Sequence, residues 1–104
     1  MAFFEDYKGD KIELTEERWE HVVSQHPEIG ALKDKIAVTL ARPDYVKKSL
    51  RDTEVELYYR FFEDVFEGKY FLVVAKGGAE RKFILTCYVT DTIKKGETLW
   101  QKKT

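Results

Sequence analysis

The apolar residues in the first part of the chain are spaced as in helices. After a short extended segment, "KIELT", they recur every three or four residues and form one helical stripe. Thr15 is a suitable N-cap, because its hydroxyl can accept a hydrogen bond from an amide of the first turn. Pro27 disfavours helical geometry at the residue before it. The first helix should therefore run from just after Thr15 to Gln25 or His26.

The same spacing continues and predicts a second helix from about Glu28 to Ala41, with Gly30 weakening the pattern near its start. Beyond residue 44 the pattern changes to strict alternation, which is typical of strands. A turn is expected at "GGAER", residues 77–81, because its two glycines can adopt positive φ. Four alternating segments are predicted to be strands: "YVKKSLRD", "VELYYRFF", "KYFLVVAK" and "KFILTCYV".

Helices followed by consecutive strands are typical of an α+β fold. We expect residues 1–104 to form one domain, in which two N-terminal helices pack on one face of a four- to five-stranded antiparallel sheet. The second face of such a sheet stays open unless a partner covers it.

Alternation also predicts which strand residues face outward. In "KFILTCYVTD", Thr86, Tyr88 and Thr90 lie opposite a plain apolar side that contains Cys87. Threonine and tyrosine also have high strand propensity, so a solvated face without a function explains the pattern equally well. If the strands pair in order, one exposed polar patch results, made of Tyr58, Arg60, Lys76, Thr86, Tyr88 and Thr90.

Such a patch has the chemistry that RNA cleavage needs. Arg60 and Lys76 could clamp a phosphate, the first through two parallel hydrogen bonds. Thr86 and Tyr88 could donate hydrogen bonds to phosphate oxygens, and Tyr58 or Tyr88 could stack on a base. A proton acceptor and a proton donor would complete the site, and no metal or other cofactor is required.

His21 and His26 are the two histidines of the chain, and histidine titrates near neutrality. They are five residues apart and do not share a helical face, which argues against a two-histidine zinc site. His26 lies on the apolar stripe at a helix end, which favours a capping or buried role. His21 lies off that stripe and is either a surface residue or a catalytic one.

Charge is uneven along the chain, whose net charge is −1. Residues 1–41 carry five lysines or arginines against nine acidic residues, and residues 42–104 carry thirteen against ten. The sheet half could thus bind an anionic partner, although its excess is far smaller than in typical nucleic-acid binders. Within it, a basic run could follow a phosphate backbone or be solvated surface; it contains Lys47, Lys48 and Arg51.

The remaining composition bears on location and partners. The one cysteine, Cys87, excludes an internal disulfide framework, and no apolar run reaches the roughly 18 residues of a membrane span. We therefore expect a cytoplasmic protein that does not enter membranes. The acidic stretch "FFEDVFE" could serve a protein partner, such as an inhibitor, or protect a sheet edge.

From about Leu14 to Trp100 the sequence resembles phage-associated nuclease-fold domains of the barnase–EndoU–colicin–RelE group. The most specific pieces are "HPE", "TLARPD", "YYR" and the Thr-x-Tyr-x-Thr strand. The resemblance implies helices on an antiparallel sheet and a metal-independent ribonuclease activity. It assigns the functional positions to His21, His26, Arg60, Lys76, Thr86 and Tyr88.

We therefore expect a small metal-independent endoribonuclease that holds RNA across the open sheet face. A non-catalytic module that binds RNA or protein with the same fold is the alternative. A metal-dependent hydrolase ranks last, because the spacing shows no ligand cluster.

Overall fold

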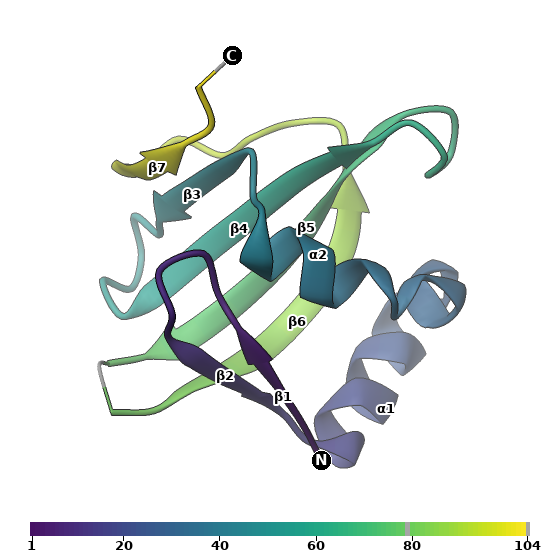
Figure 1. Cartoon of the computed structure of the whole chain (residues 1–104). Helices are drawn as coiled ribbons and strands as arrows, with labels where there is room; N and C mark the ends of the chain where they lie inside the picture. Colours follow the sequence, from purple (N-terminus) through teal and green to yellow (C-terminus); the bar gives the residue numbers. More distant parts are fainter. Residues whose placement is uncertain (79, 104) are drawn as a thin grey trace.

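The computed structural model describes residues 1–78 and 80–103, and it contains more strand than helix (Figure 1). Ala79, in the turn expected at residues 77–81, lies outside the described residues. The elements in chain order are β1 (Ala2–Glu5), β2 (Lys11–Leu14), α1 (Glu16–Gln25), the 3-10 helix η1 (Pro27–Leu32), α2 (Lys35–Ala41), β3 (Tyr45–Lys48), β4 (Val55–Phe62), β5 (Lys69–Gly77), β6 (Lys82–Thr90) and β7 (Thr98–Gln101).

The described strands form one seven-stranded sheet in the order β1-β2-β6-β5-β4-β3-β7. Every neighbouring pair is antiparallel except β2 and β6, which run parallel. The expected fold, two helices on a four- to five-stranded antiparallel sheet, is therefore wrong. The sequence pattern missed β1 and β7 because neither "AFFE" nor "TLWQ" alternates between apolar and polar residues, and pairing with a neighbour decides their conformation.

The helical part is confirmed at its start and corrected after it. The Thr15 hydroxyl accepts a hydrogen bond from the Arg18 amide at 3.1 Å, and α1 ends at Gln25, as expected. The second helix is not continuous, because residues 27–32 form η1 and only the seven residues of α2 are α-helical. Gly30 within this segment weakens an α-helix there, whereas Pro27 occupies its first position, where proline is tolerated.

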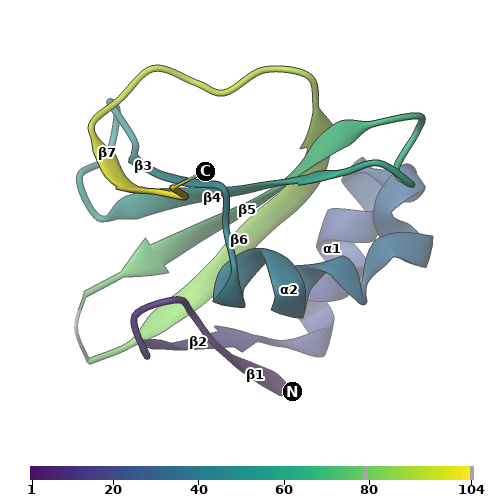
Figure 2. The same cartoon turned by 45° about the horizontal axis from the view of Figure 1, so that its top comes forward.

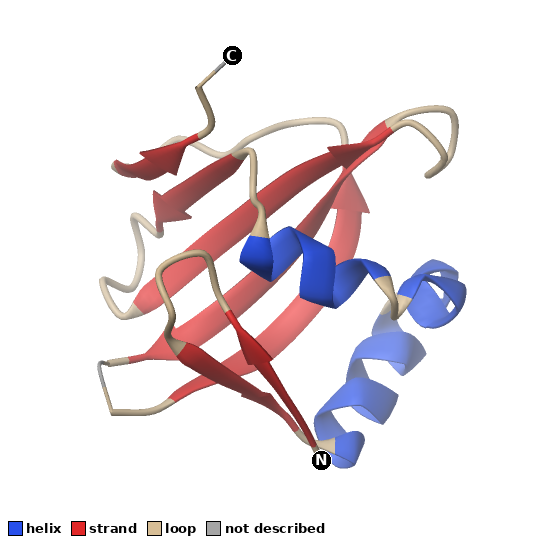
Figure 3. Cartoon of the chain, in the orientation of Figure 1, coloured by secondary structure: helices blue, strands red, loops and turns tan. Residues whose placement is uncertain are grey.

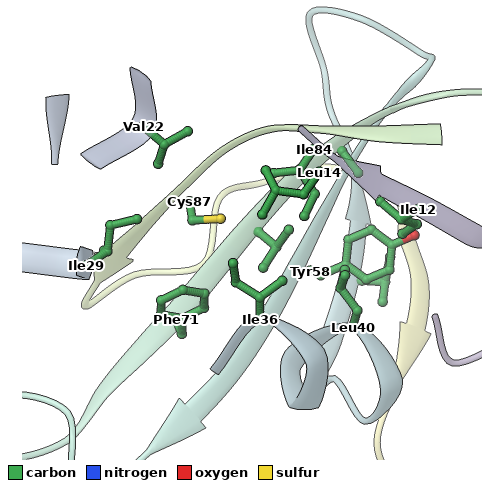
Figure 4. Close-up of a cluster of buried hydrophobic side chains, with 13 residues drawn as sticks. Ile12, Leu14, Val22, Ile29, Ile36, Leu40, Tyr58, Phe71, Ile84 and Cys87 are labelled. Atoms are coloured by element: carbon green, nitrogen blue, oxygen red, sulfur yellow. The ribbon is translucent and has the colours of Figure 1, made fainter. Parts of the chain in front are cut away.

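Helix α2 packs against β4 and β5, and it also contacts β1, because the β1–β2 hairpin curves toward it (Figure 2). The main core fills the space between these elements (Figure 4). Tyr58, expected on the open face, is fully buried there among Ile36, Leu40 and other apolar side chains. Tyr58 lies opposite Val73, which lies opposite Cys87, so these three side chains share the helix side of the sheet.

A charged cluster lies at the edge of this core. The Lys82 ammonium, 5% exposed, lies 2.7 Å from a Glu56 oxygen, 2.8 Å from Asp10 and 3.5 Å from Asp6. The Tyr58 hydroxyl donates toward Asp6 at 2.7 Å and lies 3.0 Å from Glu56. These five residues, the Lys82 cluster, connect the β1–β2 hairpin to β4 and β6.

The cluster perturbs the titration of its members. Burial and the hydrogen bond to Asp6 raise the pKa of Tyr58. Burial alone would lower the pKa of Lys82, but hydrogen bonds to Asp10 and Glu56 raise it overall. The hydrogen bond from Lys82 holds the pKa of Asp10 below its ordinary value.

The other side of the central strands, the open face, carries a second apolar cluster built around Val55, Leu57, Tyr59 and Leu72. No residue of a described helix belongs to it. The loop that joins β6 to β7, tan in Figure 3, contacts this face: Ile93 packs on the cluster, and the Lys94 amide donates to the Tyr59 hydroxyl at 3.0 Å.

Candidate functional site on the open face

Strand β6 presents Thr86 and Tyr88 to the open face, and it carries a bulge next to them. The register with β5 shifts after Thr86, so that Val74 lies opposite Thr86 but Ala75 lies opposite Ile84. Leu85 is the extra residue. Thr86 and Tyr88 therefore share the open face as expected, but Ile84 turns to the helix side, and simple alternation is wrong at that point.

A hollow of about 550 Å³ lies on the open face beside the β6–β7 loop. Its size is within the range of small-molecule sites. Strand residues form a mainly apolar floor, and residues from two loops surround it. The lining consists of Val55, Leu57, Val74, Thr86 and Tyr88 below, with Ser49, Leu50, Arg51, Lys94 and Lys95 around it.

Thr86 lines this open-face hollow. Its hydroxyl oxygen is shielded from solvent and has no hydrogen-bond partner in the part of the chain that the structure describes. A buried hydroxyl without a partner is costly, so a ligand that offers a hydrogen bond here would be favoured.

Three exposed side chains make the hollow cationic: Arg51, Lys94 and Lys95, the rim cations. None of them forms an ion pair with another residue in the ranges 1–78 and 80–103. Lys76 also lies on this face, but it is 2.8 Å from Asp52. Hydrogen bonding to Asp52 raises the pKa of Lys76, so its charge is already neutralised by a partner.

An imidazole lies beside the hollow. His26, the C-cap residue of α1, stacks on the ring of Tyr88, with centroids 5.2 Å apart and the planes 24° from parallel. Its side chain is 34% exposed, and its Nδ1 lies 3.8 Å from a Glu28 carboxylate oxygen. The helix end thus brings a titratable group to the face that the strands form.

The predicted polar patch is divided between two sides of the sheet. Arg60 lies on the helix side, opposite Phe71, and donates to the Arg42 carbonyl at 2.6 Å. Tyr58 is buried in the core, as described above. His21 is exposed on α1, next to Thr15, Glu17 and Arg18, in a separate shallow hollow. These three residues therefore cannot act with Thr86 and Tyr88.

Most of the other residues predicted to contact RNA do not line the open-face hollow. The Thr90 hydroxyl accepts from the Thr92 amide at 3.2 Å. Lys47 donates to the Thr98 hydroxyl at 2.7 Å, and Lys48 lies 3.9 Å from a Glu97 oxygen. Of the basic run, only Arg51 lines the hollow. Sequence reasoning missed Lys94 and Lys95, although the run "IKKGE" shows two adjacent cations before a glycine.

The described residues contain neither a metal-binding cluster nor a membrane-spanning helix. Residues 1–78 and 80–103 contain no group of three or more histidine, cysteine or acidic side chains that could hold a metal ion. None of the described helices has the length and apolar character needed to cross a membrane. Comparison with protein-family models, with curated proteins and with solved structures finds no match.

Proposed function

We propose that the protein is a metal-independent endoribonuclease whose site is the open-face hollow, with His26 as its acid–base group. The observation that carries this proposal is the stacking of His26 on Tyr88 beside a hollow surrounded by the rim cations. The motifs "HPE" and Thr-x-Tyr-x-Thr, which resemble the nuclease-fold group, supply His26, Thr86 and Tyr88.

The hollow suits one nucleotide of a single strand. Its apolar floor accommodates a base, and the rim cations attract the phosphates on either side. The Thr86 hydroxyl is shielded and lacks a partner among the described residues in the free protein; when the side chain turns toward the hollow, it donates to a phosphate oxygen. Neutralising these two phosphates predicts a binding constant that falls with about the 1.4th power of salt concentration, since each phosphate contributes a slope of about 0.7 for single strands.

The chemistry is an internal transesterification. His26 removes the proton from the ribose 2′-hydroxyl, and that oxygen attacks the adjacent phosphorus. The bond from phosphorus to the 5′-oxygen breaks, and the Tyr88 hydroxyl gives the leaving oxygen its proton. The products are a 2′,3′-cyclic phosphate and a free 5′-hydroxyl. The rim cations stabilise the charge that develops on the phosphate.

The test is cleavage of end-labelled single-stranded RNA and of total RNA in the presence of a chelator. His26→Gln keeps a polar side chain without a titrating group and should lower the rate by about 10²- to 10⁴-fold. His21→Gln is the matched control, because His21 is exposed on the same helix away from the hollow, and its rate should stay within about twofold.

A second measurement separates binding from turnover. Wild-type protein and His26→Gln should bind a 2′-O-methyl RNA, which cannot be cleaved, with similar affinity. Binding without cleavage by the wild type would replace the enzyme with a non-cleaving RNA-binding module. Equal cleavage by wild type and His26→Gln would remove His26 from the mechanism.

We also propose that the protein is cytoplasmic. Its one cysteine, Cys87, is a free, buried thiol, which is compatible with a reducing compartment.

A further inference from the structure

A second hollow, of about 450 Å³, lies on the helix side of the sheet. It forms where the end of α2, strand β4 and the C-terminal strand β7 meet, and the segment after β1 closes it. Three cationic and two aromatic side chains dominate its lining: Arg42, Arg60, Lys102, Tyr7 and Trp100. We refer to it as the cationic pocket.

Within residues 1–78 and 80–103, the three cations of this pocket have no acidic partners. Arg42, Arg60 and Lys102 form no ion pair with any residue that the structure describes. Three like charges gathered around one hollow repel one another unless an anion lies between them. Their arrangement therefore favours an anionic ligand.

Arg60 adds an independent observation. Its guanidinium has five N–H donors. One of its Nη atoms donates to the Arg42 carbonyl at 2.6 Å, while its Nε is buried and finds no acceptor in the described ranges. The Arg60 guanidinium also lies 5.5 Å from the centre of the Phe62 ring, which fixes its plane. A fixed and under-satisfied guanidinium at the wall of a hollow is well suited to hold phosphate.

Trp100 supplies a stacking surface beside these cations. Its side chain is 42% exposed, and its indole nitrogen donates to the Pro43 carbonyl at 3.4 Å, which orients the ring. Tyr7 lies against it, with centroids 5.4 Å apart and planes 30° from parallel. Tyr7 also packs on Tyr58, so its ring separates the pocket from the acidic groups of the Lys82 cluster.

We propose that the cationic pocket binds a small aromatic phosphate of the nucleoside monophosphate class. Arg42, Arg60 and Lys102 hold the phosphate, and the base stacks on Trp100. This site is separate from the open-face hollow, because Arg60 and Tyr88 lie on opposite sides of the sheet. Its occupancy does not depend on ribonuclease activity.

Tryptophan fluorescence can test the proposal. In a Trp19→Phe background Trp100 is the one remaining tryptophan, and adenosine 5′-monophosphate should change its emission in a saturable way. Inorganic phosphate and adenosine, titrated separately, should each bind more weakly than the nucleotide. Arg60→Gln and Lys102→Gln should each weaken binding about tenfold or more, because a charge-assisted hydrogen bond is lost.

Arg60→Gln could weaken binding by unfolding the protein. Lys102→Gln tests the pocket without that risk, because Lys102 is exposed. Lys11→Gln, which removes an exposed cation from β2, is the matched control and should leave binding within about twofold of the parent. No saturable response to millimolar nucleotide, or equal affinity in the parent and both pocket variants, would overturn the site. Equal affinity for phosphate and nucleotide would overturn the stacking role of Trp100.

Discussion

Replacing Lys82 by methionine tests whether the Lys82 cluster connects the β1–β2 hairpin to the sheet. Methionine keeps most of the side-chain volume and removes the charge. Asp6, Asp10 and Glu56 would then face one another without the ammonium that lies within 3.5 Å of all three. The Tyr58 hydroxyl carries a single proton, so it can satisfy only one of its two carboxylate neighbours.

The free energy of unfolding that Lys82→Met should lose follows from the burial of the cluster. Removing one partner of a buried ion pair destabilises proteins by about 3–5 kcal/mol, because the remaining charge has lost its solvent and its counter-ion. Glu56 and Asp10 are partly exposed, with side chains 15% and 31% accessible, and can regain some water. We therefore expect about 3 kcal/mol, which is a fall in Tm of about 12–24 °C for a domain near 100 residues.

Urea unfolding monitored by circular dichroism measures the loss. Lys69→Met is the matched control, since Lys69 pairs with Asp91 at an exposed site, and surface pairs contribute about 0–1 kcal/mol. The reasoning would be refuted if Lys82→Met cost no more than Lys69→Met.

The pH dependence of the unfolding free energy gives a second check on the role of the Lys82 cluster. The pKa of Asp10 is lowered in the fold, so its contribution is present above the unfolded value of 3.8 and is lost as pH falls through the lower, folded value. The pKa of Lys82 is raised, so its contribution is complete below 10.5 and is lost as pH rises through the higher, folded value. The difference between wild type and Lys82→Met should be constant from about pH 5 to 9 and shrink in acid.

Three further outcomes are expected. Gly96→Ala should cost about 1–3 kcal/mol in urea unfolding, because φ is +157° there and a Cβ would lie 2.3 Å from the Lys48 carbonyl oxygen; a neutral result would show that the β6–β7 loop tolerates displacement. Burial raises the pKa of the Cys87 thiol to about 12, so Ellman's reagent at pH 8 should modify it only as fast as the protein opens. Thr15→Ala should cost about 1 kcal/mol through loss of the cap of α1, by the same unfolding assay.

The strands and the first helix were predictable where one local signal decides the structure. Thr15 and Pro27 mark the two ends of α1, and alternation identifies β4, β5 and β6. The sides of β4 were not predictable, because consecutive residues Tyr58 and Tyr59 are both buried, one on each face. Alternation between apolar and polar residues cannot decide orientation when both faces are covered.

The residues of the candidate site were predictable only where alternation continues without interruption along a strand. Thr86 and Tyr88 share a face as expected, because they lie two apart on the same side of the bulge at Leu85. The bulge itself depends on pairing with β5 and leaves no local signature. Alternation predicts Tyr58 and Arg60 on the open face, but the Tyr58 ring packs in the main core and its hydroxyl contacts Asp6 and Lys82, so both residues lie on the helix side.

The most direct measurement of RNA binding at the open face is NMR of the two histidine side chains during titration with a 2′-O-methyl RNA oligonucleotide. The imidazole signals of His26 should shift and saturate with the RNA, since its ring lies on Tyr88 beside the hollow. Those of His21, exposed elsewhere on the same helix, should stay in place. Equal shifts at both histidines, or a shift at His21 alone, would contradict RNA binding at this site.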